Sequence, residues 1–313
     1  MQDTYHHVPV LLRESVDALA IRRDGIYVDV TLGGGGHSRE VLRRLGSGGH
    51  LFSFDQDAEA IAQCEAEAEA TEQGDGPTWT LVRSNFRYLR SWMRYYGIDA
   101  VDGVLADLGV SSRHFDAAER GFSFRADAPL DMRMNQQARL KASDVVNTYT
   151  QEQLATIFRL YGELQQANRL AAAIVRTRQA EPIATTAALA GVLAPLLGRD
   201  RESKDMAKAF QALRIEVNHE MDALRDMLLA ATALLTPGGR LAVIAYHSLE
   251  DRIVKNLVRS GNIEGHVEQD IYGRTTSPLV AVGKPLTPAA DELATNSRSR
   301  SARLRIAEKT APH

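Results

Sequence analysis

The segment from Val28 to His37, with the sequence VDVTLGGGGH, constrains the fold more than any other part of this chain. Its β-branched residues end in four glycines at positions 33–36, after which an amphipathic stretch begins. This order indicates a buried strand, a tight loop and the start of a helix, as in the nucleotide-binding turn of an open α/β sheet. Glycine lets the backbone approach a ligand more closely than any residue with a Cβ. We therefore expect Gly35, Gly36 and His37 to contact a bound ligand.

An acidic residue follows at the spacing that an adenosine ligand requires. A second predicted strand, residues 50–54, ends at Asp55, which is 20 residues beyond Gly35. A carboxylate in that place can accept hydrogen bonds from both hydroxyls of a ribose. Phe86, after a third predicted strand at 79–82, can lie against an adenine or pack in the core. The glycines and Asp55 together predict a cofactor that contains adenosine.

The composition of the chain limits the classes of protein to which it can belong. Its 313 residues are 44% hydrophobic, which is enough for a sizeable core. The single cysteine, Cys64, excludes a disulfide framework. No apolar run is long enough to cross a bilayer and the first residues lack a secretory signal, so we expect a cytoplasmic protein without membrane contact. The net charge of −3 restricts any contact with nucleic acid to local basic patches.

Strands and helices alternate at both ends of the chain but not in its middle. Residues 112–215 have helical periodicity and almost no strand signal. A helix over 213–235 is expected to lead back to the sheet, and 285–300 read as an exposed loop. We predict an α/β protein in which residues 1–111 and 216–313 form a core with a parallel sheet and residues 112–215 form an all-helical inserted domain. The predicted strands occupy 26–31, 50–54, 79–82, 101–108, 240–246, 279–282 and 302–306.

Two polar residues at predicted strand ends are candidates for catalysis. Asp107 ends an apolar strand, where burying a carboxylate without a partner is costly, so a functional role is favoured. His247 follows the strand at 240–246 and can orient a substrate. The segment after it also reads as a helix start with Ser248 as its cap, which is a structural interpretation of the same residues. No group of His, Cys, Asp and Glu has the sequence spacing of metal ligands, so no metal is expected.

Longer segments, which together cover essentially the whole chain, resemble one enzyme family. Two of them are especially distinctive, PLDMRM at 129–134 and YHSLEDRIVK at 246–255. The other segments are HVPVLLRESVDAL (7–19), DVTLGGGGHS (29–38), FDQDAEAI (54–61), VDGVLADLGVSS (101–112), ERGFSF (119–124), AFQALRIEVNHE (209–220), TPGGRLAVIA (236–245) and NSRSRSARLRIAEK (296–309). In these motifs the chain resembles the bacterial 16S ribosomal RNA cytosine methyltransferase family, known as MraW or RsmH.

This resemblance implies a fold, a cofactor and a reaction. The fold would be that of a class I S-adenosylmethionine-dependent methyltransferase, a Rossmann-like sheet with an inserted helical domain. The reaction would transfer a methyl group to the exocyclic 4-amino nitrogen of a cytidine in the decoding centre, at the P site of 16S ribosomal RNA. The partner would be the small ribosomal subunit or its RNA. A homodimer is left open.

The resemblance also implies roles for individual residues. Asp107 would lie near the methyl centre, and His247 is a second candidate for catalysis. The sequence after Asp107 lacks the proline-proline-aromatic form of other amino-methyltransferases, so the acceptor of the amine proton stays open. His114 stands where many relatives have glutamine, which makes the charge at that position pH-dependent. By position in the family pattern, the cofactor contacts fall on Gly35, Gly36, His37, Asp55, Phe86, Asp107 and His114.

Aromatic and basic side chains elsewhere are candidates for contact with RNA. Phe122, Phe124 and Tyr246 can receive a base lifted out of its stack, although the two phenylalanines can equally pack the insertion onto the core. Two groups of arginines are candidates for contacts with phosphates. They are Arg83, Arg87, Arg90 and Arg94, and then Arg298, Arg300, Arg303 and Arg305.

Two other functions remain compatible with the residues. A glycine loop followed by an acid also suits an NAD-dependent oxidoreductase, although GGGGH lacks the spaced glycines of G-x-G-x-x-G. A non-catalytic RNA-binding factor can keep the same fold as a scaffold. Titration with NAD and S-adenosylhomocysteine tests the first alternative, and transfer of a labelled methyl group to small subunits tests the second.

Overall fold

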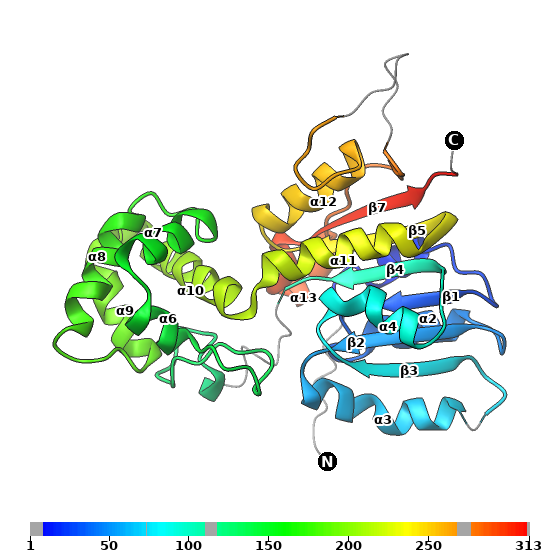
Figure 1. The fold of residues 1–313 in the computed structure, drawn as a ribbon, viewed down its shortest axis with the longest axis horizontal. Coiled ribbons are helices and arrows are strands. Elements are labelled where there is room, and N and C mark those ends of the chain that lie inside the picture. Colours follow the sequence, from blue (N-terminus) through cyan, green and yellow to red (C-terminus); the bar gives the residue numbers. More distant parts are fainter. Residues whose placement is uncertain (1–8, 73, 110–117, 268–276, 312–313) are drawn as a thin grey trace. The chain divides into compact units, whose positions relative to one another are not determined.

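The computed structural model describes residues 9–72, 74–109, 118–267 and 277–311. The chain divides into two compact units (Figure 1). Unit 1 comprises residues 1–109 and 221–313, and unit 2 comprises residues 110–220. The sequence places these boundaries at 111/112 and 215/216.

Unit 1 is built from alternating strands and helices around one sheet (Figure 1). Its first part contains α1 (Leu12–Ala18), β1 (Ile26–Asp29), α2 (Gly36–Arg44), β2 (His50–Asp55), α3 (Ala58–Glu72), β3 (Thr78–Arg83), the 3-10 turn η1 (Phe86–Tyr88), α4 (Leu89–Tyr95) and β4 (Val101–Asp107). Its second part contains α11 (Glu220–Leu234), β5 (Leu235–Ala245), α12 (Ser248–Ser260), β6 (Leu279–Ala281), α13 (Ala290–Thr295), the 3-10 turn η5 (Ser297–Ser301) and β7 (Arg303–Lys309).

The sheet has seven strands in the order β3-β2-β1-β4-β5-β7-β6. β1 pairs in parallel with β2 on one side and with β4 on the other, so the winding of the chain reverses between β1 and β4. The prediction of a Rossmann-like α/β fold is confirmed. The predicted parallel sheet is confirmed for β1–β5 but is wrong for β7, which runs antiparallel to both β5 and β6.

Both faces of the sheet are buried, which is why its strands are almost continuously apolar. Alternate side chains belong to two separate clusters of buried residues. On one face Val28, Phe52 and Val104 pack with residues of α4, α11 and α12. On the other face Tyr27 and Leu51 pack with residues of α1, α2 and α3. Helices on both faces leave the strand ends as the edge at which a ligand can bind.

Three local predictions differ from the structure. A continuous helix over 213–235 is wrong, because His219 has a φ of 51° and separates α10 (Glu202–Asn218) from α11. The loop expected at 285–300 instead contains α13 and η5. Residues 236–239, which carry the sequence of a turn, lie within β5 where its register with β4 shifts, and Gly238 has a φ of 81°.

Every element of unit 2 among its described residues is helical. They are η2 (Ala118–Arg120), α6 (Ala142–Thr148), α7 (Gln151–Leu160), α8 (Ala167–Arg178), α9 (Thr186–Leu193), η3 (Ala194–Leu196), η4 (Arg199–Arg201) and α10. Unit 2 has its own core, in which Leu154, Phe158, Leu170 and Leu213 are completely buried.

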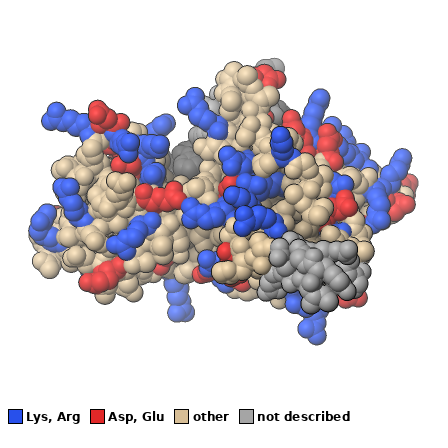
Figure 2. All heavy atoms as spheres, turned by 90° about the horizontal axis from the view of Figure 1, so that it is seen from above, with Lys and Arg blue, Asp and Glu red and all other residues tan. Residues whose placement is uncertain are grey.

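Charges of both signs are mixed on the surface. Figure 2 shows one face of the molecule, on which Lys and Arg side chains are interspersed with Asp and Glu. This distribution agrees with the net charge of −3 and leaves local patches as the places where one sign prevails. None of the helices formed by the described residues has the length and hydrophobicity needed to cross a membrane.

Candidate functional site

The glycine loop follows β1 and is held by Asp55 at the end of β2. Asp55 accepts hydrogen bonds from the backbone N–H of Gly33 (2.9 Å) and of Asp57 (2.9 Å). Gly33 and Gly35 have φ values of 51° and 76°, in the region that favours glycine, and Gly35 is the N-cap of α2. A carboxylate can accept about four hydrogen bonds, so holding the loop and binding a ribose are compatible roles.

The last glycine of the loop, Gly36, packs against the N-terminal segment of the chain. A Cβ on Gly36 would overlap the ring of Pro9, so only glycine fits there. The next residue, His37, is buried and its Nε2 lies 3.2 Å from the carbonyl oxygen of Val10. Since a carbonyl only accepts, this contact puts a proton on Nε2. Contacts with Pro9 and Val10 therefore account for the glycine at position 36 and the histidine at position 37, two residues that the sequence assigns to ligand binding.

A chain of buried hydrogen bonds lies behind the loop and was not predicted. Asp29, only 1% exposed, accepts from Ser38 Oγ at 2.7 Å. Ser38 Oγ lies 2.9 Å from Ser53 Oγ, which accepts from Trp79 Nε1 at 2.8 Å. Trp79 can only donate and an ionised Asp29 can only accept. Each hydrogen bond in this network is therefore donated in the direction of Asp29. An acid inside an apolar strand was the available sequence signal for this network.

Asp107, at the end of β4, is tied to the ends of β1 and β5. Its backbone N–H donates to Thr31 Oγ1 at 2.7 Å, and its Oδ1 accepts from the hydroxyl of Tyr246 at 2.8 Å. Burial raises the pKa of Asp107 to about 6, although the charge of His37 and the Tyr246 hydrogen bond oppose the shift. Burial and the Asp107 carboxylate likewise raise the pKa of Tyr246, which keeps this phenol protonated as the donor.

The second oxygen of Asp107 faces His37. His37 Nδ1 lies 3.8 Å from Asp107 Oδ2, beyond hydrogen-bond distance. Within the described part of the chain, no hydrogen bond to Oδ2 is found, so this oxygen is the acceptor that the site presents. The side chain of Asp107 is 24% exposed. The structure thus brings together Asp107, His37 and Tyr246. The sequence named all three residues but predicted no contact among them.

His247 caps helix α12. Its Nδ1 accepts from the backbone N–H of Glu250 at 3.4 Å, and Glu250 Oε2 accepts in return from the backbone N–H groups of Tyr246 (2.8 Å) and His247 (3.3 Å). This is a capping box. The prediction that Ser248 is the cap is therefore wrong by one residue. The box orients the backbone at Tyr246, whose hydroxyl reaches Asp107.

Phe86 begins the turn that follows β3. The turn is capped by Asn85, whose Oδ1 accepts from the backbone N–H of Arg87 at 3.0 Å. Asn85 Nδ2 donates to Gln56 Oε1 at 3.0 Å, which ties this turn to the residue after Asp55. Phe86 is half-buried and packs against the core, so both roles considered for it stay compatible with its position.

Other candidates from the sequence have different surroundings. Phe122 is buried in the core of unit 2, and Phe124 packs edge-on against Phe210 with ring centroids 5.5 Å apart, so packing accounts for both. Arg303 and Arg305 both pair with Asp251, at 3.1 and 2.7 Å. His114 lies outside the described residues.

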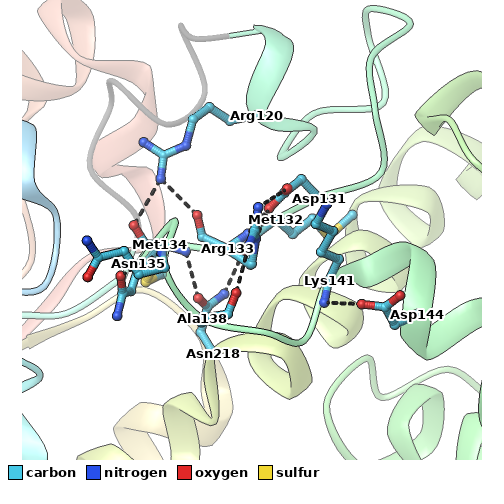
Figure 3. Close-up of polar contacts among 11 residues, drawn as sticks. Arg120, Asp131, Met132, Arg133, Met134, Asn135, Ala138, Lys141, Asp144 and Asn218 are labelled. Atoms are coloured by element: carbon cyan, nitrogen blue, oxygen red, sulfur yellow. Dashed lines mark hydrogen bonds and ion pairs between the residues drawn. The ribbon is translucent and has the colours of Figure 1, made fainter.

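The motif at 129–134 forms a tightly held loop in unit 2 (Figure 3). Arg133 forms a bidentate ion pair with Asp131, in which Nε donates to Oδ1 at 2.8 Å and Nη2 donates to Oδ2 at 2.7 Å. Met132 is fully buried and has a φ of 61°, a strained value for a residue with a side chain. Asn218 donates to the Met132 carbonyl (2.8 Å) and accepts from the Met134 N–H (2.8 Å).

Two further contacts fix the same loop. Arg120 donates to the carbonyl oxygens of Arg133 and Met134, at 2.8 and 3.0 Å (Figure 3). Burial disfavours the charge on Asp131, but the Arg133 guanidinium outweighs it and holds the pKa of that carboxyl below its usual range. Charged residues of this motif therefore act on the conformation of the loop, a role that the sequence alone did not reveal.

Comparison with known proteins identifies the family. A model of the MraW methylase family matches residues 4–310. A protein of Bacteroides fragilis named ribosomal RNA small subunit methyltransferase H is 57% identical over 98% of this chain and 99% of its own. One of the same name from Cytophaga hutchinsonii is 50% identical over 97% of this chain and 99% of its own. A solved rRNA methylase of Streptococcus thermophilus covers 97% of this chain and 99% of its own at 12% identity and a TM-score of 0.42. By the match of nearly its whole length, this chain belongs to the MraW methylase family.

Proposed function

We propose that this protein uses S-adenosylmethionine to methylate the 16S ribosomal RNA of the small ribosomal subunit, at the exocyclic 4-amino nitrogen of a P-site cytidine. The observation that carries the proposal is membership of a methylase family whose curated relatives are named for this RNA, with 57% identity over nearly the full chain. The proposed substrate places the activity in the cytoplasm.

The strand ends fit the proposed cofactor chemically. S-adenosylmethionine supplies a methyl group that its sulfonium already activates for transfer. Asp55 offers carboxylate oxygens to the ribose hydroxyls, and the glycine loop and Phe86 flank the same strand ends. His37 and Asp107 complete the set assigned to the cofactor, and His114 is assigned with them. Acceptor oxygens at Asp55 and Asp107 suit a ligand that combines hydroxyl donors with a positive charge.

Asp107 is the residue we assign to the acceptor amine. The lone pair of a cytosine amine is delocalised into the ring, so the amine must be held in line with the methyl group and its N–H groups drawn toward an acceptor. Tyr246 holds Oδ1 of Asp107 at 2.8 Å, which leaves Oδ2 to accept from the amine. The carboxylate form is required, because a protonated Asp107 would offer a donor in the wrong place. His247 acts as a positioning residue through its cap.

Mapping of methylated nucleosides tests the proposed function directly. We expect mass spectrometry of 16S ribosomal RNA to show 4-amino methylation at one P-site cytidine in cells with this protein and an unmethylated cytidine in cells without it. Purified protein should restore that methyl group to RNA or subunits from the deficient cells. An unchanged modification pattern would exclude the proposed reaction.

Asp55→Ala is expected to weaken binding of S-adenosylhomocysteine by about 10- to 100-fold. Hydrogen bonds to a charged group contribute about 1.5–3 kcal/mol each, which corresponds to that range of dissociation constants. Calorimetric titration measures the change. Asp24→Ala, which removes an exposed acid before β1 at the other end of the strand, is the matched control and should leave the constant unchanged. Equal affinities for the Asp55 variant and the wild type would place the ribose elsewhere.

Tyr246→Phe is expected to shift the pH dependence of methyl transfer to higher pH. The single-turnover rate of the wild type should rise with pH through a midpoint near 6, because Asp107 must be ionised and its pKa is about 6. The Tyr246 hydroxyl lowers that pKa, so its removal raises the midpoint, and the loss of rate is larger at pH 6 than at pH 8. An equal loss at both pH values would show that Tyr246 acts only through packing.

A further inference from the structure

Helix α4 and the residues around it carry an unusual concentration of aromatic and basic side chains. Residues 83–98 contain five aromatic residues and four arginines but no acid, in a chain that is only 6% aromatic. Several of these side chains are exposed: Tyr88 by 54%, Tyr95 by 75% and Tyr96 by 37%, and Arg90 and Arg94 are exposed as well. We refer to the five exposed residues Tyr88, Arg90, Arg94, Tyr95 and Tyr96 as the α4 patch.

The spacing along α4 separates the exposed arginines and Tyr95 of the patch from the buried face of the helix. Arg90 and Arg94 are four residues apart, and Tyr88 and Tyr95 are seven apart, so each pair recurs on the same face. Leu89 and Met93, fully buried, form the opposite face and pack into the core of unit 1. Arg90, Arg94 and Tyr95 therefore lie on the exposed part of the helix, with the two arginines and Tyr95 on different flanks of it, whereas Tyr96 packs against Phe52 of the sheet.

The arginines of the patch carry uncompensated charge. Arg87, one turn earlier, is paired with Asp226 at 2.6 Å. Arg90 and Arg94 form no ion pair with any residue that the structure describes, and the nearest acids in the sequence lie at Asp75 and Asp99. Of the arginines that the sequence proposes for phosphate contacts here, Arg90 and Arg94 thus remain available and Arg87 does not.

The tyrosines of the patch rest on a stack of rings that reaches the core. Tyr96 lies 5.1 Å from the buried Phe52 and 5.2 Å from Tyr95, as measured between ring centroids. Trp92 contacts both tyrosines, at 5.6 and 6.1 Å. These ring contacts hold Tyr95 in place although most of its surface faces solvent. A ligand that stacks on Tyr95 then loses little free energy to ordering it.

We propose that the α4 patch binds RNA, with Arg90 and Arg94 on backbone phosphates and Tyr95 stacked on an unpaired base. The inference rests on the proposed function, since the RNA is the methyl acceptor. Cationic side chains beside preorganised aromatic rings are the combination that binds single-stranded nucleic acid. The patch combines exposed tyrosines with two guanidinium groups that have no acidic partner among the described residues.

Removal of the two charges is expected to change the salt dependence of RNA binding. The slope of log affinity against log salt is negative. For Arg90→Gln with Arg94→Gln its magnitude should decrease by about 1.4, since each phosphate contact on a single strand contributes about 0.7. The probes are a fluorescein-labelled oligouridylate and purified 16S ribosomal RNA, measured by anisotropy without cofactor. Lys255→Gln with Arg259→Gln is the matched control, because both residues are exposed on α12 at the same spacing of four.

Removal of the ring is expected to change affinity but not its salt dependence. Tyr95→Ser should weaken binding of both probes by about tenfold, as loss of one stacked base implies, and should leave the slope unaltered. Because Tyr95 is 75% exposed, this substitution does not open the core. The two variants together separate phosphate contact from base stacking.

Other outcomes would overturn the inference. If the patch variants bind RNA as the wild type does while S-adenosylhomocysteine binding is intact, the RNA lies elsewhere and only this inference fails. If the wild type itself binds neither RNA probe, the proposed function fails with it. If sedimentation shows that Tyr95→Ser dissociates a dimer while the RNA constants stay the same, the patch joins two copies of this chain instead.

Discussion

Asp107→Asn is expected to lower the single-turnover rate of methyl transfer by about 100-fold or more. Loss of a group that accepts a proton or a hydrogen bond in the transition state costs about 10²–10⁴ in rate. The amide keeps an oxygen to accept from Tyr246, so the local packing is retained. RNA affinity should change little. A variant that loses RNA affinity but transfers the methyl group at the normal rate would contradict the placement of Asp107 beside the amine.

The same substitution is expected to stabilise the protein at neutral pH. The pKa of Asp107 is raised to about 6, so the folded state holds this proton more tightly than the unfolded chain does. The stability that protonation provides is lost as pH rises from about 4 through 6, at a cost of about 1–3 kcal/mol above pH 7. Asparagine avoids that cost.

Urea unfolding at two pH values measures this gain. At pH 7.5 the Asp107→Asn variant should unfold at higher urea than the wild type, and at pH 4 the two should unfold together. Asp99→Asn, an exposed acid just before β4, is the matched control and should show no pH-dependent gain. A variant that is slower but no more stable would mean that the buried carboxylate is compensated in the folded state.

Gly121→Ala is expected to destabilise unit 2 by about 3 kcal/mol or more. Gly121 has a φ of 71°, and a Cβ there would overlap the carbonyl oxygen of Pro129, which is backbone and not free to swing aside. Backbone strain of this kind costs about 1–3 kcal/mol, and a steric overlap adds to it. The loop at 129–134 would have to move, although Arg120 and Asn218 hold it.

Gly97→Ala is the control for this prediction. Gly97 has the same φ of 71°, but a Cβ there would meet nothing within 4 Å, so this variant carries the backbone strain without the overlap. Hydrogen exchange of peptides from each unit, measured in increasing urea, gives the stability of the two units separately. Similar losses in the two variants would show that the left-handed conformation alone is responsible.

Much of unit 1 could be predicted because its signals are local. The strand at 101–108 and the helix at 58–71 agree with β4 and α3 to within one residue, since apolar runs and helical periodicity belong to neighbouring residues. His219 shows the limit of this reasoning. Its surroundings are helical in pattern, and nothing local predicts the φ of 51° that separates α10 from α11.

Sequence patterns named the residues of the candidate site, whose roles stay predictions, but gave none of the contacts between them. Asp107 and Tyr246 were each named, yet their hydrogen bond joins positions 139 residues apart and depends on β4 and β5 being neighbours. Arg87 is similar, because its ion pair with Asp226 spans 139 residues and removes it from the arginines available to RNA. Spacing along a chain carries no information about such pairs.

The sequence by itself determined the alternation of strands and helices, the glycine turn before α2 and the motifs that identify the family. Each of these is written in the order of adjacent residues. Only the tertiary structure decided that β7 runs against its neighbours, that Pro9 needs the glycine at 36 and that His247 caps α12. These features depend on which distant segments meet, and their free energy comes from burial and hydrogen bonds that exist only once the chain has folded.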